Sequence, residues 1–219
     1  MLTKEEVIYA SRAVDHLLVG VSDLDSGIAW FEKVSGVRAA IGGSHPGAGT
    51  RNALVSLGAR RYLELIAPDP QQTSYSFPID VRHLATPQLV TWALGTADIK
   101  AREKAIREAG YQVLGPVDGS RARPDGTVLR WKTMRIANSA GSPGLQPIPF
   151  FIEWSSDSRH PSEDSPKGCE LRSFRIEHPE ASSIAQALER LGIEAEVRTA
   201  TRPRLIAKVS TPKGDVEID

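Results

Sequence analysis

The stretch Tyr62-Leu63-Glu64-Leu65-Ile66-Ala67-Pro68 decides the fold prediction for this chain. It is a short apolar run that holds one glutamate and ends at a proline, which is typical of a β-strand. The same pattern returns at Phe150-Phe151-Ile152-Glu153-Trp154 and at Asp215-Val216-Glu217-Ile218-Asp219. Because an unpaired buried charge is costly, a glutamate inside an apolar strand needs a partner or a function. Three such strands predict that the chain repeats one structural unit.

The residues before each of these strands predict the rest of the unit. In the first copy, an apolar strand at 13–21 precedes a helix whose inward face carries Leu24, Ile28 and Phe31. A strand at 37–41 and a hairpin formed by 52–57 and 62–67 complete the order β-α-β-β-β. That order recurs twice, so we predict an α+β fold made of repeated modules. The predicted modules are 1–70, 86–157 and a shorter third copy at 169–219, with 1–157 forming one domain.

The composition limits the classes of function open to the chain. Its 219 residues include 27 lysines and arginines and 27 aspartates and glutamates, so the net charge is zero. A nucleic-acid-binding protein would show a basic excess, and a membrane span would need about 20 consecutive apolar residues. Cys169 is the only cysteine, which excludes an internal disulfide. Residues 1–12 contain no apolar run, so we expect no signal peptide and a cytoplasmic protein.

Two polar segments leave alternatives open. The glycine-rich segment 42–50 either binds an anion through its backbone N–H groups or is a tight connection whose glycines supply positive φ. A basic cluster surrounds a predicted hairpin and is either a solvated face or a site for a substrate carboxylate or phosphate. The members of this cluster are Arg121, Arg123, Arg130 and Lys132.

Five motifs spread over nearly the whole chain carry a family resemblance. They are Val14-Asp15-His16, Gly43-Ser44-His45-Pro46-Gly47, Tyr62 to Pro68, Gly119-Ser120-Arg121 with Arg123-Pro124-Asp125-Gly126, and Trp154 with His160-Pro161. Together they resemble the vicinal oxygen chelate superfamily, which includes glyoxalase I, extradiol dioxygenases and fosfomycin and bleomycin resistance proteins. More narrowly, the chain is similar to the glyoxalase-like branch. The resemblance implies a half-open mixed β barrel of two βαβββ modules with flanking helices, to which this chain adds a third βαβββ-like module.

The resemblance also implies a metal site, because the first and fourth strands of each module donate one ligand apiece in the superfamily. Carried over by position, His16, Glu64 and Glu153 would bind a divalent ion such as Zn, Ni, Mn or Fe. Thr91 occupies the fourth ligand position and is a poor ligand, so a position stays open for water or substrate. Glu153 or His45 would transfer the proton. We expect substrate contacts from Thr50, Asn52, Tyr62, Thr91, Arg121, Arg123 and Trp131.

Three interpretations of function therefore compete. The first is a metal-dependent lyase, isomerase or dioxygenase that acts on a small oxygenated substrate. The second is a metal-free small-molecule-binding protein, similar to the drug-sequestering members, and Thr91 at the ligand position favours it. The third is a purely structural or partner-binding remnant. The odd number of modules predicts that the third either packs against a partner chain in a homodimer or covers the barrel edge. Strand alternation predicts that Trp92 and Trp154 pack beneath the helices.

Overall fold

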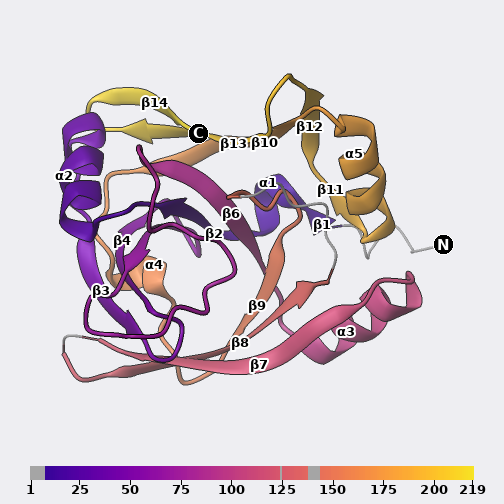
Figure 1. Cartoon of the computed structure of the whole chain (residues 1–219), viewed down its shortest axis with the longest axis horizontal. Coiled ribbons are helices and arrows are strands. Elements are labelled where there is room, and N and C mark those ends of the chain that lie inside the picture. Colours follow the sequence, from indigo (N-terminus) through magenta and orange to yellow (C-terminus); the bar gives the residue numbers. More distant parts are fainter. Residues whose placement is uncertain (1–7, 124, 138–143) are drawn as a thin grey trace.

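The computed structural model describes residues 8–123, 125–137 and 144–219 (Figure 1). Pro124 of the arginine-containing motif, the first seven residues and most of the predicted loop at 138–148 lie outside this description. One large mixed sheet dominates, with the strand order β3-β4-β5-β2-β6-β9-β8-β7. Its strands are β2 (Val14–Gly20), β3 (Ala40–His45), β4 (Thr50–Ser56), β5 (Tyr62–Pro68), β6 (Gln88–Gly95), β7 (Val113–Ala122), β8 (Val128–Ile136) and β9 (Phe150–Trp154).

The strand order confirms the predicted α+β half-barrel. Strands β2 to β5 form one half of the sheet and β6 to β9 form the other, and the two halves meet where β2 pairs antiparallel with β6. Each half contains a parallel pair, β2 with β5 and β6 with β9, which a helix connection makes possible. The two halves therefore have corresponding topologies, as tandem βαβββ modules require.

Local signals explain where the two long connecting helices begin and end. Helix α2 (Leu24–Ser35) begins where the Asp23 side chain accepts a hydrogen bond from the backbone N–H of Ser26, and ends at Gly36 with φ 80°. Helix α3 (Ile99–Glu108) begins in the same way at Asp98. Both helices pack apolar side chains against the outer, convex face of the large sheet and lie away from its concave face (Figure 1).

The glycine-rich segment differs from its prediction. Strand β3 includes Gly42 and Gly43, which were expected to lie in a loop after a strand at 37–41. The sheet curls until β3 approaches β7 at its far end, and the Arg121 side chain of β7 donates a hydrogen bond to the carbonyl of Gly42. A Cβ at Gly43 would lie 2.6 Å from the carbonyl oxygen of Ala122, so only glycine permits this approach.

The third module covers the outer face of the large sheet. Its elements are β10 (Glu170–His178), α5 (Ala181–Arg190), β11 (Ile193–Glu194), β12 (Glu196–Thr199), β13 (Arg204–Thr211) and β14 (Gly214–Ile218). Phe174 of β10 packs against Trp92 of β6, with ring centroids 4.8 Å apart, and one apolar core spans both sheets. The module thus buries its apolar face within the same chain, and the homodimer stays a prediction. Within the described residues, no helix has the length and apolar character needed to span a membrane.

The short elements complete the chain. Strand β1 (Ile8–Tyr9) pairs with β11, and helix α1 (Ala10–Ala13) leads from it into β2. Helix α4 (Pro161–Asp164) lies in the segment between β9 and β10, which was predicted to be a plain linker. This segment returns to the large sheet, because α4 contacts β4.

Candidate functional site

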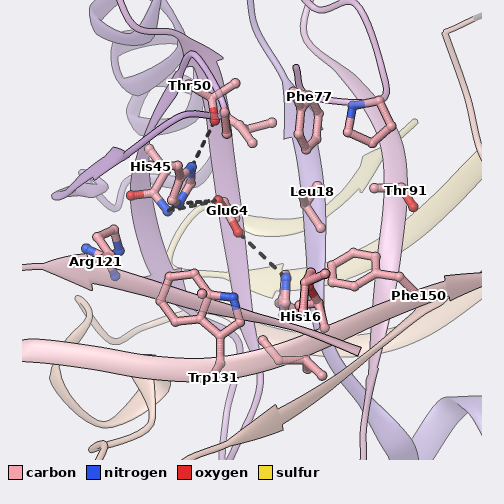
Figure 2. Close-up of a pocket in the computed structure, with 18 of the residues that line it drawn as sticks. His16, Leu18, His45, Thr50, Glu64, Phe77, Thr91, Arg121, Trp131 and Phe150 are labelled. Carbon is pink, nitrogen blue, oxygen red and sulfur yellow. Dashed lines mark hydrogen bonds and ion pairs between the residues drawn. The ribbon is translucent and has the colours of Figure 1, made fainter. Parts of the chain in front are cut away.

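The concave face of the large sheet lines a cavity of about 430 Å³ (Figure 2). Strand alternation turns every second side chain toward it, so His16 on β2 and Tyr62 and Glu64 on β5 share this space. Strands β7 and β8 contribute Arg121 and Trp131 from the opposite wall. The cavity therefore collects residues that lie far apart in the sequence, as expected for a ligand site.

Glu64 is the carboxylate at the centre of the polar part of this cavity. It is 5% exposed, and its Oε1 accepts a hydrogen bond of 2.8 Å from Asn52 Nδ2. His16 Nε2 lies 3.7 Å from Oε2, and His45 Nε2 lies 3.7 Å from Oε1. Figure 2 shows the two imidazoles on either side of the carboxylate. The arrangement places one buried acidic group within reach of two groups that can exchange protons.

His45 is held in a neutral form. Burial lowers the pKa of its imidazole, against the opposing influence of the Glu64 carboxylate. Asn52 Nδ2 lies 3.2 Å from His45 Nε2 and donates to it, so the ring proton is on Nδ1 and is donated to Thr50 Oγ1 at 2.9 Å. Hydrogen bonds at both ring nitrogens thus hold the His45 side chain in place beside Glu64.

Asp15 orients the second imidazole, a role that sequence reasoning missed. Its Oδ1 lies 2.8 Å from His16 Nδ1, and its Oδ2 accepts hydrogen bonds from His160 Nε2 and Trp154 Nε1, each at 3.1 Å. Burial alone would raise the pKa of Asp15, but the hydrogen bonds from His16 and His160 outweigh it and lower the pKa to about 2. The ionised Asp15 fixes the proton of His16 on Nδ1 and turns Nε2 toward Glu64.

A β-bulge makes this arrangement possible. Val14 pairs with Leu94 and His16 with Ala93, so Asp15 is an extra residue in β2. A bulge re-aims side chains that would otherwise point to opposite faces of the sheet. Adjacent residues Asp15 and His16 can therefore hydrogen-bond to each other. The only signal for Asp15 in the sequence was its place beside His16 in the first motif.

Glu153 does not lie where it was predicted. Its Oε2 accepts a hydrogen bond of 2.6 Å from the backbone N–H of Ile99 at the start of α3, on the convex side of the sheet. Phe150, Ile152 and Trp154 are the residues of β9 that line the cavity. Alternation along β9 therefore turns Glu153 to the convex face of the sheet, whereas Glu64 lies on the concave face. The prediction that Glu153 joins the metal and catalytic residues is wrong. Trp154 faces the cavity for the same reason, whereas Trp92 is buried in the core as predicted.

The donors that remain do not fit the metal centre that the resemblance implies. In the part of the chain that the structure describes, no group of three or more His, Cys, Asp or Glu is arranged to hold a metal ion. His16 and Glu64 are two suitable donors, and the lone pair of His45 Nε2 is already occupied by Asn52. A catalytic centre of this kind has three protein ligands in typical cases. The predicted set of His16, Glu64 and Glu153 is therefore not assembled.

The other predicted residues divide into two groups. One group lines the cavity: Thr50, Asn52, Tyr62, Thr91, Arg121 and Trp131. Arg123 is the exception, because it forms an ion pair with Asp164 and a hydrogen bond of 3.1 Å with the carbonyl of Arg159, away from this cavity. At the turn of the glycine-rich segment, the N–H groups of residues 47–49 already have partners within the chain. Gly47 and Gly49 both donate to Gln72 Oε1, so the glycines serve a tight connection.

A curled sheet of two corresponding halves around one cavity defines a glyoxalase-like vicinal oxygen chelate fold. The family model described as a glyoxalase-like domain matches residues 14–192, and the chain belongs to that family. A crystal structure of a hypothetical protein from Staphylococcus aureus shares the fold, with a TM-score of 0.71, 14% identity, and coverage of 94% of this chain and 98% of that one. Methylmalonyl-CoA epimerase from Mycobacterium tuberculosis is similar at a TM-score of 0.45 and 18% identity, over 70% of this chain and 91% of that one. No curated protein matches the sequence.

The ionised state of Asp15 predicts a loss of stability in acid. Its folded-state pKa of about 2 lies below the ordinary 3.8, so its contribution is fully present above 3.8 and is lost as the pH falls toward 2. The loss from this group is expected to be roughly 2 kcal/mol. Urea unfolding at pH 4, 3 and 2 measures this loss. In Asp15→Asn, the free energy of unfolding should fall less steeply with decreasing pH over this range. An equal slope in the variant would contradict the assignment.

Proposed function

We propose that this chain is an enzyme that transfers a proton at a carbon next to a carbonyl group of a small oxygenated substrate. The observation that carries the proposal is the buried Glu64 carboxylate, which faces the cavity between His16 and His45 and forms no structural ion pair with Lys or Arg among the described residues. A buried carboxylate without such a partner is costly to keep and is the kind of group that serves as a general base.

The chemistry requires a base, an acceptor for negative charge and a route for proton return. Glu64 takes the proton from the carbon, and the electron pair of the C–H bond moves to the carbonyl oxygen to give an enolate. Arg121 lines the same cavity and supplies N–H donors that stabilise this oxygen. Delivery of a proton to the other face of the same carbon completes an isomerisation. Where that carbon carries a hydroxyl group, the enolate is an enediolate, and protonation of the former carbonyl carbon while the hydroxyl becomes the new carbonyl also completes an isomerisation. Loss of a leaving group from the enolate would instead complete a lyase reaction.

His16 supports Glu64 through its fixed orientation. Asp15 accepts the Nδ1 proton of His16, so Nε2 faces the base and receives or returns a proton during the cycle. The Asp15 side chain is buried at 4% exposure, which keeps water from competing for this hydrogen bond. Asp15 is a positioning residue in this proposal, because it acts through His16.

The proposed proton transfer differs from the metal-dependent interpretation in that it does not require a bound metal. A dioxygenase of the expected type needs a metal held by several protein ligands, and among the described residues His16 and Glu64 are the two suitable donors in the cavity. Proton transfer needs no such centre. We therefore expect the activity to survive dialysis against EDTA, and loss of activity with full recovery on adding Mn, Ni, Zn or Fe(II) would restore the metal-dependent interpretation.

A metal-free binding protein is the second candidate. The aromatic lining of the cavity by Tyr62, Phe77, Trp131, Phe150 and Trp154 favours it, since such walls bind apolar ligands without any chemistry. Under this alternative, ligands raise the melting temperature but undergo no change.

Proton exchange tests the proposed function without knowledge of the natural substrate. Panels of 2-oxo acids, 3-oxo acids and their esters are incubated in D2O, and loss of the C–H signal is followed by ¹H NMR. We expect exchange of at least one compound, and a decrease of roughly 10²- to 10⁴-fold in Glu64→Gln, which keeps the shape of the side chain but removes the base. Exchange that persists in a folded Glu64→Gln variant, or ligand binding without any exchange, would contradict the proposal.

A further inference from the structure

Arg121 is a buried cation without an anionic partner. Its side chain is 4% exposed, and among the described residues no carboxylate lies within ion-pair distance of it. Within the described ranges, its guanidinium makes one hydrogen bond, which Nη1 donates to the carbonyl of Gly42. Burial lowers the pKa of Arg121, although the nearby Glu64 carboxylate favours its charged form. An arginine keeps its charge even in such surroundings, so the site retains a positive group.

The remaining donors of Arg121 have no hydrogen-bond partner among the described residues. In the described part of the chain, the fully enclosed side-chain atoms that lack a partner are Arg51 Nε, Asn52 Oδ1 and His178 Nε2. The Nε and Nη2 atoms of Arg121 are not among them, so neither is fully enclosed, and Arg121 lines both this cavity and a second one of about 240 Å³. These two atoms form the edge of the guanidinium that matches the two oxygens of a carboxylate.

The neighbouring basic residues do not share this role. Arg123 pairs with Asp164, and Arg130 lies 3.6 Å from Asp157 on the exposed side of β8. The basic cluster recognised in the sequence is therefore divided by the structure, and Arg121 is the member that enters the cavity.

The opposite part of the cavity has a mainly apolar wall, although Arg135 and Gln146 also line the cavity. A separate cluster of buried side chains, which includes Leu18 and Ile66 with Phe77 and Phe150 packed against it, supplies this wall. Figure 2 shows Arg121 on one side of Glu64 and Leu18, Phe77 and Phe150 on the other. A ligand that fills the cavity therefore meets the buried Arg121 at one end, the proposed base in the middle and a mainly apolar wall, with the partly exposed Arg135 near Phe150, at the other end.

We propose that the cavity selects an organic carboxylate with an apolar or aromatic body, whose acid group is bound by the free edge of Arg121 and whose body packs against Leu18, Phe77 and Phe150. The inference rests on the proposed function only for its chemical consequence, which is that the reacting C–H group of the bound acid lies toward Glu64. Binding itself requires no catalysis.

Matched ligands test this selection. 3-Phenylpropanoate and 3-phenylpropanamide have the same body and differ in the charge of the head group, and acetate carries the head group alone. Isothermal titration calorimetry of the intact chain should show the acid binding roughly tenfold or more tightly than the amide, as expected for charge-assisted hydrogen bonds. Acetate should bind more weakly than the phenyl acid, because it buries no apolar surface.

Two variants assign the selection to Arg121. Arg121→Gln should bring the two phenyl ligands to similar affinity, and Arg121→Lys should retain part of the preference. Arg130→Gln removes an equal charge from the exposed side of β8 and should keep the wild-type preference. Circular dichroism melting of each variant verifies folding, since Arg121 also links β7 to β3.

The binding experiments test carboxylate selection independently of the proposed enzyme activity. Equal binding of acid and amide, no binding of either at millimolar concentration, or a preference that survives in folded Arg121→Gln would overturn it. Selection of the acid by a chain that exchanges no C–H proton would keep this inference and remove the proposed enzyme activity.

Discussion

Replacing Asp15 with alanine is expected to lower the free energy of unfolding by roughly 3–5 kcal/mol, the range for breaking a buried charged network by removing one partner. Three donors depend on this carboxylate: His16 Nδ1, His160 Nε2 and Trp154 Nε1. All three would lose this acceptor, and His16 and His160 are almost fully buried, so their unpaired donors carry a desolvation cost. Urea unfolding at pH 7 measures the difference.

The control is Asp157→Ala, which removes an exposed carboxylate near Arg130. It should change stability by no more than about 0.5 kcal/mol. A loss below 1 kcal/mol for Asp15→Ala would show that the three donors find other partners, and the proposed orientation of His16 would then have no support.

The order of elements was accessible from the sequence because its signals are local. Asp23 and Gly36 mark the two ends of α2, and the apolar run around Glu64 is a strand in the structure. His16 and Glu64 were correctly predicted to face one cavity, since residue identity and strand alternation both pointed there. The third module was recognised from the same repeat, but its packing on Trp92 depends on tertiary contacts that no local pattern encodes.

The predictions fail where a shift of one residue in strand register changes the face of the sheet to which a side chain points. Glu153 sits in an apolar strand as Glu64 does, yet the cavity side of β9 is taken by its neighbours Ile152 and Trp154. A shift of one position reverses every side chain of a strand, and single-sequence patterns do not fix that position. The bulge at Asp15 is a similar case, because it is visible only from the pairing of β2 with β6.

His160 could not be placed from sequence because its partner is distant. It lies 145 residues after Asp15, in a polar segment with two prolines that was predicted to be a linker. In the structure it is 1% exposed, and its Nδ1 is occupied by Ser162, which leaves Nε2 to donate to Asp15. A buried histidine in a polar segment is a tertiary feature, and composition alone gave no reason to expect it.

The central claim is that Glu64 is the base of the cavity and Glu153 is not. The most direct measurement compares C–H exchange in D2O for the wild type, Glu64→Gln and Glu153→Gln under identical conditions. Glu153→Gln should keep the wild-type rate, because its carboxylate bonds to the start of α3 outside the cavity. Glu64→Gln should lose roughly 10²- to 10⁴-fold. Equal losses in both variants, or a loss in Glu153→Gln alone, would contradict the account.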